Sequence, residues 1–513
     1  MTGLVETGFG PIKRYQYLLA YARLNTPKNR RKAGKMSLWT AIEIEQALQL
    51  KQKLPDNIEI DLISIDSRNV KPNSMFFGLK GENHNGSDYA VSALKNGAEL
   101  CIVDHYPIHD PKLKAKMILV PDVYQAMISL AKYARQRFSG KLIAVTGSAG
   151  KTSTKEMLGL ALSDYKTFIN PGNKNNLIGL PFSLCQVQAD CQFVVLEVGM
   201  NRPGELRQLS HLAQPHIAVV TNVYPAHLQF FDSVADIARA KAEIFEGVLP
   251  SGHGVFPGDS EYSSILADVA RSHNLSITTF GEKKEFNGGK DCDIRLGEVA
   301  CESYDDSKTL SDGSYVRMDS KSYLVKIHTH GKVIEYKTSF NSKHMIINSL
   351  AIAGVIQALD LNMQSSLGHL QKFTPLAGRG MVHHLRDDIT LIDDSYNANP
   401  GSMRAGIANL ANHRNGRLIA IIGDMRELGD SAIDLHKSLL DEFIAKKVDK
   451  VFTVGDLMSE LFAILPEELQ GVETNDAITM AKSILNHLQP RDSILVKGSF
   501  SMDMNRIVSV IVG

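Results

Sequence analysis

The residues that could do chemistry begin with a glycine-rich segment, GSAGKT, which spans residues 147–152. An apolar run of strand length precedes it and a helical pattern follows it, which is the context that a phosphate-binding loop requires. In such a loop, backbone N–H groups face the phosphates, Lys151 neutralises β- and γ-phosphate charge, and Thr152 can hold Mg²⁺. The strict pattern has glycine five residues before Gly150, where this chain has Val145. The alternative is a chance glycine-rich turn, but strand, Lys-Thr pair and helix together predict a phosphate loop.

Two further polar side chains follow apolar runs of strand length. Glu197 ends the run FVVLE, where a buried acid is costly unless it meets a cation. It could hold Mg²⁺, or it could be a structural acid that caps Asn201 or a nearby helix. His227 comes shortly after the next apolar run, and a lone histidine is more often structural than a ligand. The residues alone leave both roles open.

Strands and helices alternate around these residues. Apolar runs at 141–146, 193–199 and 216–223 are separated by helical patterns, which predicts a parallel, doubly wound α/β sheet with ligand sites at the carboxyl ends of its strands. Polar residues and short alternating runs at 258–340 predict a β-rich excursion within the same domain. Further alternation after residue 363 predicts a second, Rossmann-like sheet.

The N-terminal part predicts a smaller α/β unit. WTAIEIEQAL is typical of a short helix capped by Ser37 or Thr40, and residues 58–70 alternate like a strand. We therefore expect an arm and three α/β domains, with these bounds: 1–35 for the basic arm, 36–138 for the N-terminal domain, 139–362 for the central domain, and 363–513 for the C-terminal domain.

The composition is that of a globular protein, with 43% hydrophobic and 22% charged residues in 513. It excludes a disordered polar chain, a collagen and a strongly basic nucleic-acid coat. The charges cancel to zero overall, yet residues 1–35 carry +7 and residues 36–513 carry −7. The arm could be a weak tether to anionic membrane or RNA, or a solvated extension ahead of a true start at Met36.

The cysteine pattern and the hydropathy indicate in which cellular compartment the protein acts. Five scattered cysteines with no CxxC pair indicate free thiols in a reducing compartment. No apolar run reaches the roughly 18 residues of a membrane span, and the N-terminus has no signal-peptide pattern. We expect a cytoplasmic, monomeric enzyme that binds no specific nucleic acid.

Eight motifs in a fixed order carry a resemblance to a known family. They are VTGSAGKTSTKE, NPGNKNNLIGLP, LEVGMNRPGE, TNVYPAHL, ARAKAEIFEG, DDSYNANPGSM, GDMRELG and VKGSFSM. From residue 37 to about 510 the chain resembles the Mur ligases, and DDSYNANP and GDMRELG make it most similar to the MurF type. The resemblance implies an ATP-dependent ligase of peptidoglycan precursor synthesis. It would join D-alanyl-D-alanine to UDP-N-acetylmuramoyl-tripeptide through an acyl phosphate and release ADP and phosphate.

The resemblance also implies metal and catalytic roles. Glu197 matches an acid that binds Mg²⁺, and His227 matches a histidine that ligates a second Mg²⁺. Lys241 matches a lysine that the family carbamylates, and a carbamate could bridge Mg²⁺ whereas an ammonium cannot. The alternative for Lys241 is an ordinary helical surface lysine. With Lys151 these residues form the implied catalytic set, and Thr152 joins the implied metal ligands.

The remaining implied roles concern recognition. The implied ATP-binding residues are Gly147, Ser148, Ala149, Gly150, Lys151, Thr152, Ser153, His344, Asn348, Arg379 and Asp394. The implied substrate-binding residues are Ser67 and Arg68 at the uridine end, Asn173 and Asn176 near the muramyl peptide, and Tyr396, Asn397 and Asn399 in the MurF-type loop. The resemblance thus assigns the uridine end to the N-terminal domain, the phosphates to the central domain, and adenine and dipeptide to closure by the C-terminal domain.

Five positions depart from the family pattern. Ser342 and Met345 replace residues of the adenine-side motif, Asn73 replaces a turn glycine, Ser87 replaces a common histidine, and Phe500 stands where arginine is usual. Two rival functions remain open. One is a ligase that adds a single amino acid, either a sibling Mur ligase or an enzyme similar to folylpolyglutamate synthase. The other is a nucleotide-binding regulatory or RNA-associated module that uses the basic arm.

Overall fold

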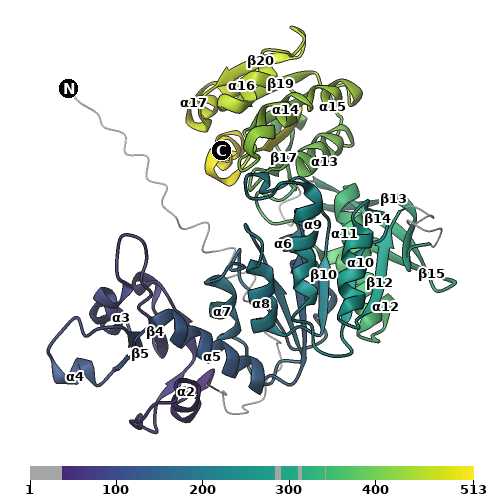
Figure 1. The fold of residues 1–513 in the computed structure, drawn as a ribbon. Helices are drawn as coiled ribbons and strands as arrows, with labels where there is room; N and C mark the ends of the chain where they lie inside the picture. The colour runs from purple at the N-terminus through teal and green to yellow at the C-terminus, as the bar shows by residue number, and fades with distance from the viewer. Residues whose placement is uncertain (1–36, 283–290, 310–314, 341) are drawn as a thin grey trace, which may run out of the picture.

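The computed structural model describes residues 37–282, 291–309, 315–340 and 342–513, so the predicted basic arm lies outside the described residues. Figure 1 shows three α/β regions that follow one another along the chain, with the central region between the other two. We call them the N-terminal, central and C-terminal regions. Each is built on a sheet of its own.

The N-terminal region carries a parallel sheet in the order β3–β4–β5–β6 and an antiparallel pair, β1–β2. Its strands are β1 (Trp39–Thr40), β2 (Glu59–Ile60), β3 (Leu62–Ser64), β4 (Ser74–Phe77), β5 (Ala98–Val103) and β6 (Met117–Leu119). Its helices and 3-10 turns are α2 (Ala41–Leu48), η1 (Ser67–Asn69), η2 (Gly86–Tyr89), α3 (Ala90–Lys95), α4 (Pro111–Lys114) and α5 (Val123–Arg137). Helix α2 is confirmed, with a capping box between Thr40 and Glu43. The single strand predicted for 58–70 is wrong, because the chain changes sheet at Asp61.

The central region is built on a sheet whose order, within the described ranges, is β15–β14–β13–β12–β11–β10–β7–β9–β8. Its strands are β7 (Lys141–Thr146), β8 (Thr167–Ile169), β9 (Phe193–Glu197), β10 (Ile217–Val220), β11 (His253–Pro257), β12 (Ser276–Gly281), β13 (Ile294–Thr309), β14 (Tyr315–Thr329) and β15 (Lys332–Thr338). Its helices and turns are α6 (Lys151–Ala161), α7 (Gly179–Leu184), α8 (Glu205–Ala213), η3 (Leu228–Phe230), α9 (Val234–Ala242), η4 (Glu243–Phe245), α10 (Ser263–Ser272), α11 (Lys343–Ala358), α12 (Met363–Gly368) and η5 (His369–Lys372). Strands β7 to β12 run parallel, which confirms the doubly wound prediction.

Both faces of this parallel sheet are covered. Along β7, Leu142 and Ala144 belong to one apolar core, and Ile143 and Val145 belong to the other. Successive side chains of a strand point to opposite faces, so a strand covered on both sides must be apolar throughout. This is why β7 is a continuous apolar run in the sequence.

Two predicted bounds need correction. The β-rich excursion begins at β13 rather than at residue 258, because Ser263–Ser272 is helical and Ser276–Gly281 continues the parallel sheet. β13 still pairs parallel with β12, whereas β13–β14 and β14–β15 pair antiparallel, as expected for an excursion. The predicted C-terminal domain begins at residue 363 and so includes α12 and η5, but Leu367 of α12 and Leu370 of η5 pack into the central core.

The C-terminal region is a second sheet in the order β16–β17–β21–β18–β19–β20, parallel except for β16. Its strands are β16 (Met381–His384), β17 (Thr390–Asp394), β18 (Leu418–Gly423), β19 (Lys450–Val454), β20 (Gln470–Thr474) and β21 (Ser493–Lys497). Its helices and turns are η6 (Arg386–Asp388), α13 (Pro400–Ala411), η7 (Gly429–Ser431), α14 (Ala432–Lys437), α15 (Leu440–Ala445), α16 (Asp456–Phe462), α17 (Ala477–Ser483), η8 (Ile484–Asn486), η9 (Phe500–Met502) and α18 (Asn505–Val512). In the described part of the chain, no helix has the length and apolar character to cross a membrane.

Candidate active site

The glycine-rich loop connects β7 to α6 at the carboxyl end of the parallel strands, as predicted. Gly147 and Gly150 have φ values of 149° and 76°, which glycine adopts without steric cost. A Cβ on Gly150 would lie 2.5 Å from Asn348 Nδ2, so Asn348 lies against the loop. Lys151 Nζ donates to Gly147 O over 2.7 Å, and Ser153 follows in the first turn of α6.

Two residues after β10 hold the loop, and sequence reasoning missed both. Thr221 Oγ1 and Asn222 Nδ2 donate to Ala149 O over 2.6 and 3.0 Å. Asn222 Oδ1 accepts a hydrogen bond from Ala149 N over 2.8 Å, and Asn222 O accepts one from Ser148 N over 3.1 Å. Their position directly after a parallel strand, inside the motif TNVYPAHL, was the available signal.

Glu197 closes β9 with only 2% of its surface exposed. Its carboxylate accepts hydrogen bonds from Thr152 Oγ1 over 2.7 Å and from Asn175 Nδ2 over 2.6 Å. Two of the predicted metal ligands therefore meet directly. The alternative in which Glu197 caps Asn201 is wrong, because the Asn201 N–H donates to Glu205 instead.

The loop that supplies Asn175 is the one in which Asn173 and Asn176 were predicted to act. Asn176 Oδ1 accepts from Gly179 N over 2.8 Å at the start of α7, and Asn173 O accepts from Asn175 N over 2.8 Å. Lys155, which is fully buried, donates to Asn170 O over 2.7 Å and so ties this loop to α6. Asn175, rather than its predicted neighbours, reaches the buried carboxylate.

Lys241 lies on α9 with 2% of its surface exposed. Burial, together with the nearby charge of Lys151, holds the pKa of Lys241 well below its usual range. Burial also lowers the pKa of Lys151, an effect that Glu197 opposes and Arg379 reinforces. The interpretation of Lys241 as a surface lysine is wrong, since its amine is enclosed beside the phosphate loop.

His227 contacts the C-terminal region. It precedes η3 in a left-handed conformation with φ of 60°, and its Nδ1 pairs with the carboxylate of Glu427. The same hydrogen bond holds the pKa of Glu427 below its usual range. The motif GDMRELG contains Glu427, but sequence reasoning assigned it no role.

Arg379, which the resemblance assigns to ATP, and Tyr396, which it assigns to the substrate-binding loop, lie together. The Arg379 guanidinium lies 3.9 Å from the centroid of the Tyr396 ring, and the Tyr396 and Phe500 ring centroids are 5.5 Å apart. Phe500 is 66% exposed. The departure at this position therefore puts an exposed aromatic ring beside the Arg379–Tyr396 pair.

A second pairing joins Asp394 to Lys497, a residue that sequence reasoning missed. Lys497 is buried, and its Nζ donates to Asp394 Oδ2 over 2.6 Å and to Asn397 O over 3.0 Å. Burial lowers the pKa of His344 at the start of α11, while Asp394 raises it and Lys497 lowers it further. His344 of the central region therefore lies within electrostatic reach of the C-terminal pair.

Asn399 joins the two regions at the loop itself. Its Nδ2 donates to Ser148 O over 3.2 Å, and its Oδ1 accepts from Ser402 N over 2.8 Å to cap α13. The departures Ser342 and Met345 are buried at the start of α11. The structure thus gathers the predicted residues of the phosphate loop, α11 and the C-terminal loop around one point.

Ser67 and Arg68 belong to a separate place. They form η1 after β3, where Arg68 pairs with Asp66 over 2.9 Å and Ser67 O accepts from Asn96 Nδ2 over 2.8 Å. These contacts lie within the N-terminal region. Asn73, the departure from a turn glycine, has φ of 60°, a left-handed conformation that asparagine tolerates.

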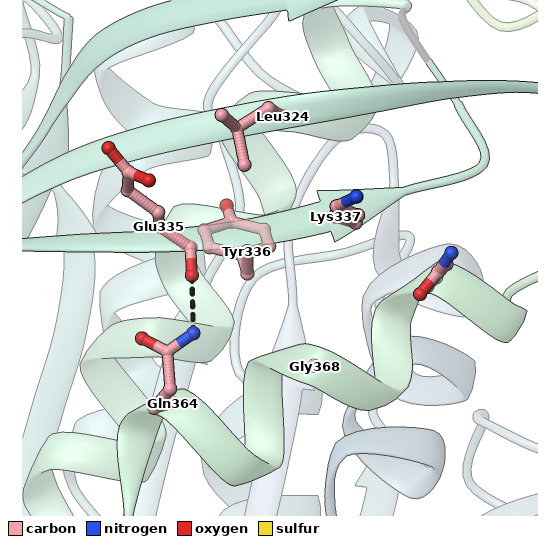
Figure 2. Close-up of a pocket in the computed structure, with 7 residues that line it drawn as sticks. Leu324, Glu335, Tyr336, Lys337, Gln364 and Gly368 are labelled. Carbon is pink, nitrogen blue, oxygen red and sulfur yellow. Dashed lines mark hydrogen bonds between the residues drawn. The ribbon is translucent and has the colours of Figure 1, made fainter. Parts of the chain in front are cut away.

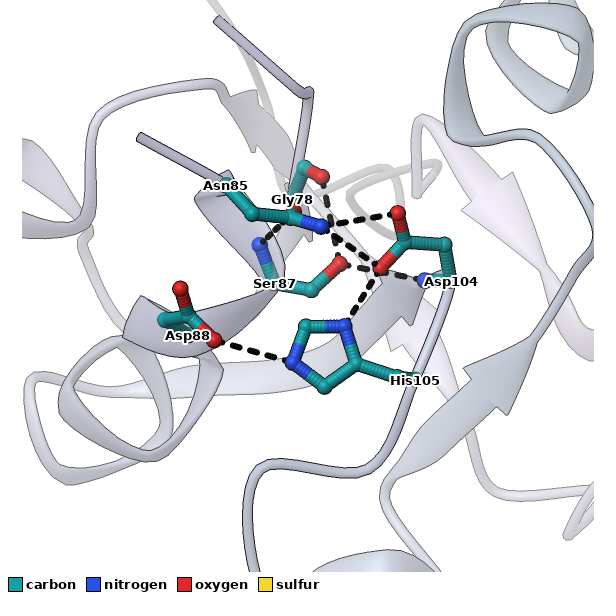
Figure 3. A network of polar contacts seen from close by, with 6 residues as sticks. All are labelled: Gly78, Asn85, Ser87, Asp88, Asp104 and His105. Atoms are coloured by element: carbon teal, nitrogen blue, oxygen red, sulfur yellow. Dashed lines mark hydrogen bonds and ion pairs between the residues drawn. The ribbon is translucent and has the colours of Figure 1, made fainter. Parts of the chain in front are cut away.

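The departure at Ser87 belongs to a polar network in the N-terminal region (Figure 3). Ser87 Oγ donates to Gly78 O over 3.3 Å and accepts from Asp104 N over 3.0 Å. His105 lies between Asp104 and Asp88, with ring nitrogens 2.7 and 2.9 Å from their carboxylates, which raise its pKa. With serine rather than the common histidine at position 87, these hydrogen bonds hold the loop that begins at Gly78.

Two other features carry no site residues. Within the described ranges, no group of three or more His, Cys, Asp and Glu side chains could hold a metal ion. His328 lies on β14 and His330 in the turn that follows it, where the His330 ring bonds the Gln357 side chain rather than a metal-ligand partner. A hollow of about 320 Å³ lies over β14, β15 and α12 (Figure 2). Its lining residues are Leu324, Glu335, Tyr336, Lys337, Gln364, Gly368 and Gln371. It contains none of the residues that the phosphate loop gathers.

Three family models match the chain. They are described as "Mur ligase family, catalytic domain" at residues 59–144, "Mur ligase middle domain" at 145–356, and "Mur ligase, glutamate ligase domain" at 378–500. Proteins named UDP-N-acetylmuramoyl-tripeptide–D-alanyl-D-alanine ligase are also similar. The one from Rickettsia prowazekii is 28% identical over 92% of this chain and 99% of its own length. The one from Escherichia coli is 28% identical over 88% and 94%.

Solved structures agree with these matches. A crystal structure of MurF from Acinetobacter baumannii has a TM-score of 0.77 and 30% sequence identity, and the similarity covers 92% of this chain and 98% of that one. The structure of MurF from Thermotoga maritima in complex with ADP has a TM-score of 0.71 and 25% identity, over 87% and 96%.

Proposed function

Because the chain belongs to the Mur ligase family, we infer that it is an ATP-dependent ligase that joins D-alanyl-D-alanine to UDP-N-acetylmuramoyl-tripeptide. The proteins that are similar to this one over nearly its full length carry that name. A similar MurF structure contains ADP. The sequence prediction of the family and of the ligase activity is confirmed. The activity serves peptidoglycan precursor synthesis.

One observation carries this function more than any other. The phosphate loop, the Thr152–Glu197 pair and the C-terminal Asn399 meet at the carboxyl end of the central sheet. Ligands of open α/β sheets bind at this edge. A nucleotide held by the loop would therefore lie between the central and C-terminal regions, where a substrate carboxylate can also reach its γ-phosphate.

The reaction brings two anionic groups together, the phosphates of ATP and the carboxylate of the tripeptide. A carboxylate oxygen of the tripeptide takes the γ-phosphoryl group, so that ADP leaves and an acyl phosphate forms. The amine of D-alanyl-D-alanine then attacks the carbonyl carbon, the C–O bond to phosphate breaks, and the amine loses a proton. Lys151, Arg379 and the loop N–H groups supply the positive field that this transfer requires.

The residues present fit Mg²⁺, which we propose as a cofactor. Thr152 and Glu197 offer a hydroxyl and a carboxylate 2.7 Å apart at the end of β9. Mg²⁺ is typically bound by one or two carboxylates plus phosphate oxygens and water, so a larger acidic cluster is not needed. When bound, Mg²⁺ would neutralise phosphate charge. His227 is proposed as a further ligand.

We also propose that Lys241 is carbamylated. Its lowered pKa favours the neutral amine, which is the form that attacks CO₂, forms the N–C bond and releases a proton. The resulting anion would lie beside Lys151 and offset the positive charge there. Intact-mass measurement under bicarbonate is the test, and an unmodified amine with no bicarbonate dependence of activity would reject the carbamate.

The remaining assignments stay predictions. Ser67 and Arg68 are proposed for the uridine end, Asn173 and Asn176 for the muramyl peptide, and Asn397 for the dipeptide side. The domain bounds, apart from the two corrections above, the monomeric state and the cytoplasmic location are likewise proposals that the sequence motivates.

The phosphate loop is tested by Lys151→Ala. We expect ADP formation with all substrates present to fall about 100- to 1,000-fold, because one preorganised charge near the transferred phosphoryl group is removed. Lys132→Ala, on the exposed face of α5, is the matched control and should keep full turnover. Turnover of Lys151→Ala close to that of the control would reject the assignment.

The acceptor is tested by a phosphate-release assay with D-alanyl-D-alanine and with D-glutamate, diaminopimelate or L-lysine alone. We expect release only with the dipeptide. Release with a single amino acid and none with the dipeptide would favour a sibling ligase. The same assay, run with the tripeptide that has diaminopimelate at position three and with the one that has lysine there, shows which of the two the enzyme prefers.

A further inference from the structure

The contact between His227 and Glu427 joins two regions of the molecule that lie 200 residues apart in sequence. We call it the clasp, and define it as His227 with η3 on the central side and Glu427 with η7 on the C-terminal side. The clasp has three independent contacts. The side chains pair through His227 Nδ1, Gln229 N donates to Glu427 O over 3.2 Å, and Leu228 packs against the C-terminal core.

The backbone on both sides is adapted to this contact. His227 and Glu427 have φ values of 60° and 65°, and residues other than glycine hold this conformation only where the surroundings impose it. A Cβ on Gly429 would lie 3.3 Å from Gln229 Cα, so the two loops are in close contact at this glycine. Such a tight fit is more than a chance touch between flexible side chains.

The pairing has a chemical consequence for the imidazole. A carboxylate on Nδ1 draws the proton to that nitrogen and leaves Nε2 with a free lone pair. This is the tautomer in which a histidine ligates a metal through Nε2. The central region alone holds Thr152 and Glu197, whereas the partner of His227 Nδ1 comes from the C-terminal region.

We propose that Glu427 is a positioning residue that fixes the tautomer and orientation of His227 when the C-terminal region docks, so that docking completes the metal side of the site. This inference rests on the proposed role of His227 as a Mg²⁺ ligand. It accounts for the pairing of an acid of the C-terminal region with His227 of the central region. ATP bound to an undocked central region would lack one oriented ligand, and phosphoryl transfer would wait for closure.

The first test measures ligase turnover of the full chain across Mg²⁺ concentrations. Removing a residue that orients a metal ligand typically costs 10- to 100-fold in metal affinity or activity. We therefore expect Glu427→Gln to raise the half-saturating Mg²⁺ concentration and lower kcat by about tenfold each, with KM for the tripeptide unchanged. Glu468→Gln, an exposed acid of the same region, is the matched control. An unchanged Mg²⁺ dependence in Glu427→Gln would overturn the proposal.

The second test separates positioning from a simple latch. A Cβ on Gly429 would lie 3.7 Å from Gln229 Cβ, near the disulfide mean of about 3.8 Å. Gln229→Cys with Gly429→Cys should therefore cross-link on oxidation, in a Cys301→Ser background because Cys301 is exposed. Because Gly429 has φ of 59°, Gly429→Ala is the control for the strain that any Cβ adds at this position. Failure to cross-link, while Gly429→Ala keeps full turnover, would show that the two loops do not meet in solution and would overturn the proposal.

Mn²⁺ binding to the cross-linked chain with ADP, followed by loss of the free Mn²⁺ EPR signal, needs no turnover. We expect Glu427→Gln to weaken Mn²⁺ binding about tenfold even when the cross-link holds the regions together. Full recovery of Mn²⁺ affinity by the cross-link would make Glu427 a latch only. His227→Ala separates the two levels: if this variant keeps normal Mn²⁺ binding, the proposed ligand role of His227 fails, whereas a loss confined to His227→Ala defeats the role of Glu427 alone.

Discussion

The central region meets its two neighbours through interfaces of different kinds. Toward the N-terminal region, one apolar core runs without interruption from Trp39 to the central sheet. Trp39 Nε1 donates to Cys185 O over 2.9 Å, and Arg137 lies over the Trp39 ring while donating to Val187 O. Toward the C-terminal region, the contacts at the phosphate loop are polar, as between Ser148 and Asn399. The clasp adds one partly buried apolar side chain, Leu228, which packs against the C-terminal core but does not join the two cores into one.

The difference indicates which part of the molecule moves. A shared apolar core is disrupted only by exposing it to water, so the N-terminal and central regions should act as one body. Small polar interfaces separate at modest cost and are typical of domains that open and close. We therefore expect the C-terminal region to be the one that opens for ATP and closes for phosphoryl transfer.

The largest expected effect comes from breaking the apolar interface. Trp39→Ala should lower the free energy of unfolding by about 3–5 kcal/mol, because it leaves a cavity in a fully buried core. Urea unfolding followed by circular dichroism measures this. Trp39→Phe, which keeps most of the apolar volume, should lose less than half as much. A loss below about 1 kcal/mol for Trp39→Ala would contradict the one-body view.

Acid should have the next largest effect, through a histidine of the central region. His216 Nδ1 accepts a hydrogen bond from Leu142 N over 3.0 Å, and burial, with Lys141 and Arg135, lowers its pKa to about 4. Between that value and the unfolded value of about 6.5, the unfolded chain binds the proton more readily, so stability is lost as the pH falls through this window. The full shift would correspond to about 3.4 kcal/mol, and because His216 is only partly buried, solvent screening makes the loss attributable to it smaller than that.

Urea unfolding at pH 7 and at pH 4.5 checks this linkage. His216→Gln should be less stable at pH 7 but should show a shallower dependence on pH. His273→Gln, an exposed histidine on the same region, should leave the pH dependence as it is. Equal slopes for the two variants would show that His216 does not carry the effect.

The smallest expected effect is at the polar interface. Asn399→Ala removes both a helix cap and the hydrogen bond to Ser148 O, and should cost about 1 kcal/mol of stability and raise KM for ATP severalfold. Asn362→Ala removes an equivalent cap on α12, where Asn362 accepts from Ser365 N over 2.9 Å. It should cost similar stability and leave KM unchanged. Equal KM values for the two variants would contradict a role for the Asn399 contact in holding the nucleotide site.

Much of the fold and part of the site could be predicted from local pattern. The Thr40 cap, the glycine-rich loop and the apolar run of β7 depend on neighbours in sequence, and each lies where it was expected. The prediction of a single strand at 58–70 was wrong because alternation along a segment does not determine which sheet each half joins. The predicted start of the β-rich excursion, residue 258, was too early. The residues near it are polar, but they include a helix with one apolar face, which the polarity alone does not reveal.

The sequence by itself determined the family, the phosphate loop and the acid at the end of β9, because these follow from short motifs and strand periodicity. Only the tertiary structure decided that Asn175 rather than Asn173 meets Glu197, that Lys241 is enclosed, and that Glu427 lies on His227. Such contacts join residues far apart in the chain, and they depend on how strands order in a sheet and how regions dock. No local pattern encodes that geometry.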